Sequence, residues 1–220
     1  MAGGRERPLR ILCLHGYRQN GISFREKTGS FRKMLKKYAE FVYITSPVEV
    51  PPIDDGQDKD GGSGWWFSRQ DNYFNAQEES ECSKGFEESL KAVEVCFKES
   101  GPFDGVLGFS QGAAMLGLLC GLQQQGKLTF SFKFAIFASA FRSRSAPHQC
   151  LYSEKITLPT LHIYGETDQV IGKDMSEELL QYFHEPETHV HPGGHFVPAT
   201  AAHKAIYVKF LEDMKQICIV

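Results

Sequence analysis

The sequence lacks the features of secreted, membrane-spanning and nucleic-acid-binding proteins. Residues 1–8 contain no apolar run, so we expect no secretory signal, and the longest apolar run, which follows Ser110, is too short to span a bilayer. The net charge is −3 and there is no dominant basic stripe, which argues against a nucleic-acid partner. The six cysteines include no C-x-x-C pair, as is typical of reduced thiols. We therefore expect a cytoplasmic protein without a membrane span.

The one dense basic segment lies at residues 25–37. The apolar residues in and around it, Phe24, Phe31, Leu35 and Tyr38, fall near helical spacing. We therefore interpret its Lys and Arg residues as the exposed face of an amphipathic helix.

The 220 residues are 41% apolar and 23% charged, which suits one enzyme-sized domain with a sizeable core. Strand-like apolar segments alternate with helix-like segments. Strands are predicted at residues 9–14, 41–45, 103–109, 133–139, 160–164 and 188–191, and helices from residue 24 and at 86–99, 113–122, 175–183 and 201–214. This alternation indicates the α/β class, with a mostly parallel central sheet and helices on both faces. We expect a single domain over residues 1–220, with a loop insertion around residues 47–75.

The most informative motif is Gly-Phe-Ser-Gln-Gly at residues 108–112. It lies where a predicted buried strand turns into an apolar helix, with Ser110 at the apex. A nucleophile elbow holds its serine in strained backbone, and glycines two residues to either side let strand and helix approach. Gly108 and Gly112 meet this requirement. The motif therefore predicts that Ser110 is a nucleophile; the alternative is a glycine-rich turn with an idle serine.

A serine nucleophile needs a base and a carboxylate that orients the base. After an elbow, these residues follow in the order Asp or Glu, then His, each on a loop at the carboxyl end of a strand. Asp168 follows the strand predicted at residues 160–164 and is our choice. Glu166 and Asp174 remain alternatives, although Asp174 also suits the start of the next helix.

Among the eight histidines, His195 has the best context for the base. It follows the strand predicted to end at His191, and the paired glycines before it allow a tight turn. His189, His191 and His195 also form an H-x-H-x₃-H pattern that could suggest zinc. We expect no metal, because no further Cys, Asp or Glu with ligand spacing accompanies these histidines.

An oxyanion formed during ester cleavage needs two backbone N–H donors. Gln111, directly after the nucleophile, supplies the first. The first predicted strand ends in Cys-Leu-His-Gly-Tyr-Arg-Gln at residues 13–19, and the N–H of Tyr17 is our choice for the second. Arg18 is the alternative donor, and an ordinary strand-end turn is the alternative interpretation of this segment.

Five motifs occur in order along the chain. They are Leu-His-Gly-Tyr-Arg-Gln at 14–19, Gly-Trp-Trp-Phe at 64–67, Gly-Pro-Phe-Asp-Gly-Val-Leu-Gly-Phe-Ser-Gln-Gly-Ala at 101–113, Gly-Glu-Thr-Asp at 165–168 and Gly-Gly-His-Phe-Val-Pro at 193–198. From about residue 8 to 210, the chain resembles the FSH family of serine hydrolases, most closely its animal esterases. The resemblance implies the α/β-hydrolase fold, no cofactor and hydrolysis of carboxylic esters, and some fungal relatives release thioester-bound polyketides. It places the catalytic triad on Ser110, Asp168 and His195.

Aromatic residues suggest an apolar acyl pocket. The candidates are Trp65, Trp66, Phe67, Met115, Phe141 and Phe196. For the triplet at residues 65–67, packing in the core is the alternative. The loop before it, at residues 47–64, is rich in Pro, Asp and Gly, and a loop of this length is usually functional or mobile. It could therefore serve as a flap over the pocket.

These observations predict a serine carboxylesterase that forms an acyl-enzyme and acts on small-molecule esters with medium or long apolar acyl chains. An acyl thioesterase is the alternative closest in chemistry. A non-catalytic hydrolase-fold binding protein is another, although such proteins usually lose a triad residue. A zinc hydrolase is the third, and it would be distinguished by its sensitivity to chelation.

Overall fold

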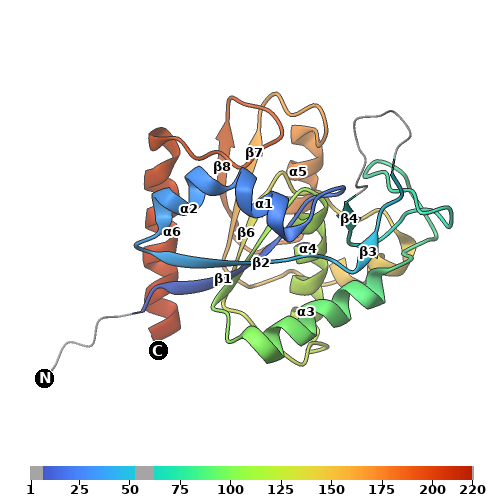
Figure 1. Cartoon of the computed structure of the whole chain (residues 1–220), viewed down its shortest axis with the longest axis horizontal. Coiled ribbons are helices and arrows are strands. Elements are labelled where there is room, and N and C mark those ends of the chain that lie inside the picture. The colour runs from blue at the N-terminus through green and yellow to red at the C-terminus, as the bar shows by residue number, and fades with distance from the viewer. Residues whose placement is uncertain (1–6, 53–61, 220) are drawn as a thin grey trace, which may run out of the picture.

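A six-stranded parallel β-sheet forms the centre of the molecule (Figure 1). The computed structural model describes residues 7–52 and 62–219. The strand order is β2-β1-β5-β6-β7-β8, and every neighbouring pair is parallel. The strands are β1 (Leu9–Leu14), β2 (Ala39–Ile44), β5 (Gly105–Phe109), β6 (Phe134–Ala138), β7 (Thr160–Gly165) and β8 (Glu187–His191).

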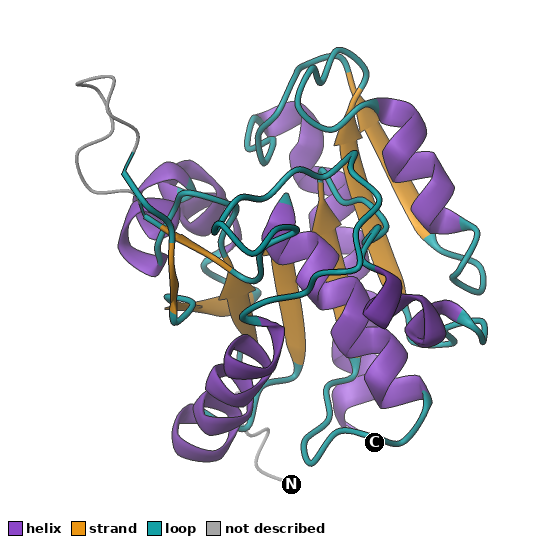
Figure 2. Ribbon diagram, turned by 90° about the vertical axis from the view of Figure 1, so that its right-hand side faces the viewer, coloured by secondary structure: helices purple, strands orange, loops and turns teal. Residues whose placement is uncertain are grey.

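Helices cover both faces of this sheet, as predicted for the α/β class (Figure 2). One apolar core lies between the sheet and the layer formed by α1 (Gly21–Lys27), α2 (Gly29–Leu35) and α6 (Ala201–Ile219). The other lies under α3 (Phe86–Ser100), α4 (Gln111–Gln124), the 3-10 helix η1 (Ala146–Tyr152) and α5 (Lys173–Leu180). Among the described residues, no helix combines the length and apolar character needed to span a bilayer.

Helix α4 is the most deeply buried helix of the described chain. Residues 111–122 are all buried. A helix that is apolar on every side belongs in the interior of a protein. The long apolar run after Ser110 is therefore a core helix, and its burial fixes the position of the turn that precedes it.

Parallel pairing brings the carboxyl ends of the strands to one edge of the sheet. Leu14 pairs with Gly108 across β1 and β5, and Gly165 pairs with His191 across β7 and β8. Strand β1 is flanked by β2 on one side and β5 on the other, so the order of the strands reverses there. Such a reversal favours a ligand-binding crevice outside the carboxyl ends of the strands.

The first and last helical regions differ from the sequence prediction. The helix predicted from Phe24 is two helices that meet at Thr28, whose hydroxyl donates a hydrogen bond to the Phe24 carbonyl at 2.7 Å. The first of them begins earlier than predicted, because Asn20 and Ser23 form a reciprocal capping box. The last helix continues to residue 219 instead of 214.

The insertion predicted around residues 47–75 contains a small second sheet. Strands β3 (Val48–Glu49) and β4 (Ser63–Gly64) pair antiparallel. Residues 53–61, the middle of the predicted flap, lie outside the described residues. The chain then passes directly from β4 to the aromatic triplet at residues 65–67, which enters the core.

Candidate active site

Ser110 occupies a sharp turn between β5 and α4. Its φ and ψ angles are 54° and −120°, which is strained backbone for a residue other than glycine. A Cβ added at Gly108 would lie 2.5 Å from the Ala113 Cα, and one at Gly112 would lie 2.3 Å from the Leu14 carbonyl oxygen. Only glycine permits both close approaches. The turn therefore has the geometry of a nucleophile elbow.

Two hydrogen bonds join Ser110, His195 and Asp168 in a chain. The Asp168 carboxylate can only accept, so His195 Nδ1 carries a proton and donates it to Asp168 Oδ2 at 2.8 Å. The neutral ring then presents Nε2 as an acceptor, which lies 3.0 Å from the Ser110 hydroxyl oxygen. The structure thus brings together the three side chains that the sequence selects, in the arrangement that activates a serine.

Asp168 is held as a carboxylate by its surroundings. Its side chain is fully buried, and its second oxygen, Oδ1, accepts hydrogen bonds from the backbone N–H groups of Val170 and Ile171, both at 2.9 Å. Burial raises the pKa of Asp168, but the hydrogen bond from His195 and those from the two backbone groups outweigh it, so the pKa lies below its usual value. Asp168 therefore stays ionised and fixes the tautomer of His195.

The two alternative carboxylates lie elsewhere. Glu166 is exposed, and its backbone N–H donates to the His191 carbonyl at 2.8 Å. Asp174 is in the first turn of α5, where its charge complements the helix dipole. Within the described residues, Asp168 is the carboxylate that bonds to His195.

The loop that carries His195 is fixed to the end of β7. Gly193 donates its N–H to His191 Nδ1 at 3.2 Å and accepts from the Thr167 N–H at 3.2 Å. A Cβ at Gly165 would lie 2.3 Å from the Gly193 carbonyl oxygen, so the two loops are in close contact. This contact holds the loop with His195 against the loop with Asp168.

The other histidines of the H-x-H-x₃-H pattern face α6. His189 Nε2 and His203 Nδ1 are 2.9 Å apart and share a hydrogen bond, while the His191 ring lies 6.0 Å from the His203 ring, measured between centroids. His195 points to Ser110 instead. In residues 7–52 and 62–219, no three His, Cys, Asp or Glu side chains are placed to hold a metal ion.

The backbone N–H groups of Tyr17 and Gln111 are available beside Ser110. Neither has a hydrogen-bond acceptor in the described part of the chain. Tyr17 lines the same cavity as Ser110, and Gln111 is the first residue of α4. Arg18, the alternative donor, has a φ of 58°, so the loop turns directly after Tyr17. These two N–H groups can serve as donors to a negatively charged oxygen.

His15 supports the loop that contains Tyr17. It is fully buried, its Nδ1–H donates to the Gly16 carbonyl at 2.8 Å, and its Nε2 accepts from the Ser46 N–H at 3.1 Å. Burial lowers the pKa of His15 to about 4, against a smaller opposite effect of the Gly16 hydrogen bond. The neutral ring therefore ties this loop to the end of β2.

Two cavities flank the three side chains. The Ser110 cavity has a volume of about 260 Å³, and its lining includes Tyr17, Phe74, Ser110, Phe141, Val170 and Ile171. The His195 cavity has a volume of about 360 Å³, and its lining includes Phe24, Lys27, Phe109, His195, Phe196 and Val197. Ser110 and His195 thus each open onto a different cavity.

Of the six candidates for the acyl pocket, Phe141 lines the Ser110 cavity. Phe196, which is 48% exposed, lines the His195 cavity instead. The remaining candidates are at most 2% exposed and line neither cavity: Trp65, Trp66, Phe67 and Met115. The triplet at residues 65–67 thus lies where the core-packing alternative puts it, and Met115 is part of the buried helix α4.

Part of the lining of the Ser110 cavity is not among the residues that the sequence predicts for the site. Residues 73–77 and the pair Val170 and Ile171 contribute to the Ser110 cavity. Residues 73–77 carry no periodic pattern that could have revealed them. Val170 and Ile171, in contrast, follow Asp168 so closely that their proximity to the site could have been inferred.

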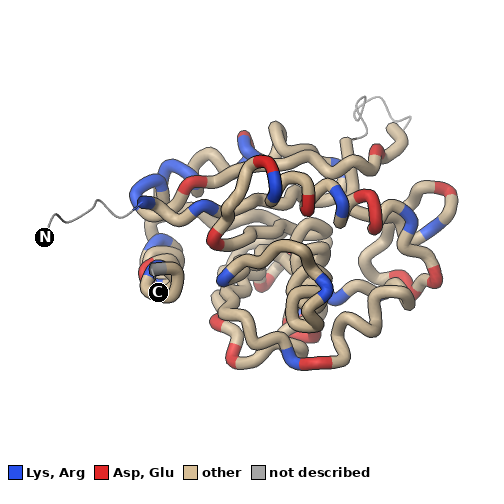
Figure 3. The backbone as a smooth tube through the Cα atoms, turned by 90° about the horizontal axis from the view of Figure 1, so that it is seen from below, with Lys and Arg blue, Asp and Glu red and all other residues tan. Residues whose placement is uncertain are grey.

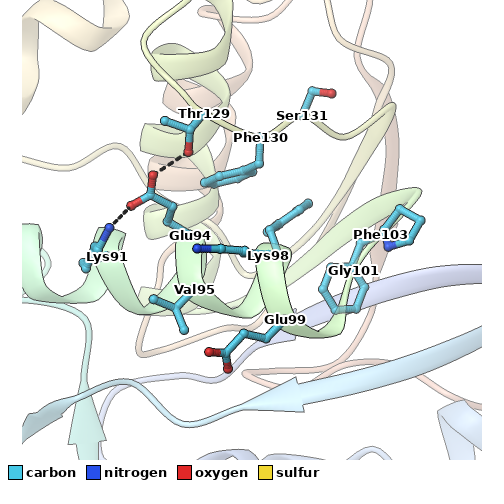
Figure 4. Close-up of a pocket in the computed structure, with 12 residues that line it drawn as sticks. Lys91, Glu94, Val95, Lys98, Glu99, Gly101, Phe103, Thr129, Phe130 and Ser131 are labelled. Atoms are coloured by element: carbon cyan, nitrogen blue, oxygen red, sulfur yellow. Dashed lines mark hydrogen bonds and ion pairs between the residues drawn. The ribbon is translucent and has the colours of Figure 1, made fainter.

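The largest cavity described lies away from these residues (Figure 4). It has a volume of about 860 Å³ and lies between α3 and the segments that precede β5 and β6. Within it, Glu94 binds both Lys91 and Thr129. Because it opens at the amino ends of the strands, it is at the opposite edge of the sheet from Ser110.

Comparisons with known proteins show the family to which this chain is related. A family model described as serine hydrolase (FSH1) matches residues 5–207. Esterase OVCA2 of Danio rerio is 49% identical, over 93% of this chain and 97% of its own length. Esterase OVCA2 of Homo sapiens is 42% identical, over 96% of this chain and 99% of its own length.

Solved structures show the same fold at low sequence identity. Acyl-protein thioesterase 2 of Zea mays matches with a TM-score of 0.65 and 18% identity, over 97% of this chain and 96% of that chain. Esterase PE8 matches with a TM-score of 0.64 and 22% identity, over 94% and 92%. These two similarities establish the α/β-hydrolase fold. Because the family model matches most of its length, the chain belongs to the FSH1 family of serine hydrolases.

Proposed function

We propose that this protein is a carboxylesterase in which Ser110 is the nucleophile, His195 the general base and Asp168 the residue that orients the base. The observation that carries the proposal is the chain of hydrogen bonds, at 3.0 and 2.8 Å, that starts at a serine in a nucleophile elbow. The names of the relatives, which are esterases, support the choice of ester substrates.

The reaction follows from this arrangement. His195 Nε2 accepts the hydroxyl proton while Ser110 Oγ bonds to the ester carbonyl carbon, and the resulting imidazolium is stabilised by the Asp168 carboxylate. The N–H groups of Tyr17 and Gln111 bind the oxyanion. His195 then protonates the leaving oxygen as its bond to carbon breaks, and water hydrolyses the acyl-enzyme by the same sequence of steps.

The lining of the Ser110 cavity supports apolar acyl groups. Its walls include Phe74, Phe141 and Ile171, and no Lys, Arg, Asp or Glu is among its described lining residues. Burial of each methylene contributes about 0.8 kcal/mol. We therefore expect medium or long apolar chains to react with a higher kcat/KM than acetyl esters, until the cavity is full.

A cytoplasmic location is part of the proposal. All six cysteines are free, and Cys13 and Cys120 are buried, where burial raises the pKa of each thiol. Free thiols persist most readily in a reducing compartment. Fractionation of cells that produce the protein would test this, and recovery mainly in a secreted or organelle fraction would contradict it.

Ester turnover by Ser110→Ala tests the function. We expect the variant to fold normally and to lose turnover of a butanoyl ester by about 10⁴-fold or more, because the hydroxyl contributes chemistry and not packing. Ser131→Ala, at an exposed serine outside both flanking cavities, is the matched control and should retain full turnover. Equal turnover in the two variants would refute the proposal.

A further inference from the structure

The two cavities beside the reacting residues differ in which of those residues they expose. Ser110 lines the Ser110 cavity and His195 lines the His195 cavity. The ring of Phe109, which packs against His195 with 4.8 Å between centroids, belongs to the second cavity. The proposed nucleophile and the proposed base are therefore accessible from two different cavities.

The chemistry of the proposed esterase, on which this inference rests, gives each space a role. During acylation the Ser110 Oγ–carbon bond forms and the bond from that carbon to the leaving oxygen or sulfur breaks. The proton passes from Ser110 Oγ to His195 Nε2 and then to the leaving atom. The acyl part thus stays attached to Ser110, whereas the leaving group must lie against His195. We infer that the His195 cavity binds the leaving group, and that Lys27 at this cavity selects leaving groups that carry an anionic substituent, a carboxylate or a phosphate.

The lining of the His195 cavity fits a leaving group with an apolar body. Phe24, Phe109, Phe196 and Val197 provide hydrophobic surface. Phe196 is 48% exposed, which is unusual for a large aromatic side chain. An apolar ligand that covers this ring would bury surface that the protein alone leaves in water.

Lys27 supplies the charge that distinguishes the two cavities. It is exposed in the last turn of α1, and no ion pair of Lys27 occurs within the described residues. Lys and Arg, and Asp and Glu, are spread over the described backbone (Figure 3), and the segment that starts with Lys27, residues 27–37, contains five Lys and Arg and follows Glu26. An anionic group in the His195 cavity would lie near the Lys27 ammonium, whereas the described lining of the Ser110 cavity includes no charged residue.

A pair of esters with the same acyl group tests the role of Lys27. We would measure kcat/KM for the butanoate esters of 4-nitrophenol and of 3-carboxy-4-nitrophenol with the parent and with Lys27→Met. The two phenols differ in intrinsic reactivity, and this difference cancels when the ratio of the carboxylated to the uncharged ester is compared between two enzymes. We expect Lys27→Met to lower this ratio about fivefold, and Lys27→Glu to lower it further. Higher ionic strength should lower the ratio in the parent and have less effect in Lys27→Met.

The matched control is Lys36→Met. It removes a charge from the same basic segment, but Lys36 is not among the residues that line the cavity. Its ratio should equal that of the parent. S-butanoylpantetheine and S-butanoyl-4′-phosphopantetheine form a second substrate pair. A larger effect of Lys27→Met in one pair shows which of the two kinds of anionic leaving group, carboxylate or phosphate, is preferred. Equal ratios in the parent and Lys27→Met for both pairs would overturn the selection of anions.

Matched leucine substitutions test which cavity holds which part of the ester. With one acyl group, every ester forms the same acyl-enzyme, so a change in the leaving-group site alters acylation but not deacylation. Phe196→Leu should change the dependence of kcat/KM on the leaving group. It should leave the deacylation rate of the butanoyl-enzyme unchanged. Phe141→Leu should change the deacylation rate and the dependence on acyl-chain length.

Opposite behaviour of the two leucine variants would show that the assignment of the cavities is reversed. Ester turnover in all variants without any of these selective effects would overturn this inference and leave the proposed function standing. Absence of ester and thioester turnover in the parent would overturn the proposed function, and the assignment of the cavities with it.

Discussion

The side chain of Gln111 binds the backbone of Trp65, with its Oε1 accepting the Trp65 N–H at 2.8 Å. Its Nε2 donates to the Trp66 carbonyl at 2.8 Å, and the Gln111 side chain is fully buried. The residue after Ser110 therefore joins the nucleophile elbow to the segment that follows β4. The Trp65 indole extends this link, because its Nε1–H donates to the His15 carbonyl at 2.7 Å.

Loss of this link should destabilise the fold and impair the site together. Gln111→Met leaves two buried backbone groups without partners, at about 1–3 kcal/mol each. We expect the free energy of unfolding in urea to fall by about 2–6 kcal/mol and kcat/KM to fall as well. Gln181→Met, at an exposed position, should change neither. A stable and fully active Gln111→Met variant would show that the link is dispensable.

Truncation of either tryptophan should affect all esters alike. Trp65 and Trp66 are 0% and 1% exposed and line neither flanking cavity, so their loss creates a void in the core. Trp65→Ala or Trp66→Ala should lower the free energy of unfolding by about 3–5 kcal/mol. Activity should fall by the same factor on acetyl and decanoyl esters. A loss confined to long chains would instead place these residues at the acyl group.

The orienting carboxylate can be identified by a pair of amide substitutions. Asp168→Asn should lower kcat by about 10⁴, because an amide no longer fixes the tautomer of His195. Glu166→Gln is the control, since Glu166 is exposed and lies in the same loop. Its kcat should remain near that of the parent. A crippled Glu166→Gln enzyme beside an active Asp168→Asn enzyme would contradict the proposed roles.

Stability should fall with acidification, in part because of His162. This ring is buried, stacks on Phe137 with 4.3 Å between centroids, and burial lowers its pKa to about 3. The unfolded chain binds a proton at His162 below pH of about 6.5, while the folded protein does not, so stability is lost as pH falls.

The free energy of unfolding is measured as a function of pH, and its slope is taken between about pH 6 and about pH 4. This range lies between the pKa of His162 in the unfolded chain and its lower pKa in the folded protein. His162→Gln should lower this slope by up to about 1.4 kcal/mol per pH unit. His184→Gln, at an exposed histidine, is the control substitution. An unchanged slope in His162→Gln would show that this histidine is also protonated in the folded state.

Local sequence patterns predict most of this fold. Each predicted strand of the central sheet is present within a few residues, because buried parallel strands are short apolar runs with clear boundaries. The glycines at 108 and 112 indicate the elbow because each permits a close approach of backbone segments. The break between α1 and α2 is not predicted, because Phe24, Phe31 and Leu35 keep nearly helical spacing across it.

The surroundings of the site were harder to predict than its reacting residues. Whether an aromatic residue faces a cavity or the core depends on how the insertion folds, and its local sequence does not encode that. Trp65 and Trp66 entered the core because their backbone is held by Gln111, a contact across more than 40 residues. Phe196, a candidate for the acyl pocket, lines the His195 cavity and not the Ser110 cavity.

The most direct test of the central claim is the site of covalent labelling by a fluorophosphonate. The reagent phosphonylates a serine that is activated by a neighbouring base much faster than it reacts with an ordinary hydroxyl group. Mass spectrometry of peptides from the labelled protein should find one phosphonate, on Ser110, and ester turnover should be lost in proportion to the labelled fraction. Label on another residue, or full turnover after Ser110 has been labelled, would contradict the account.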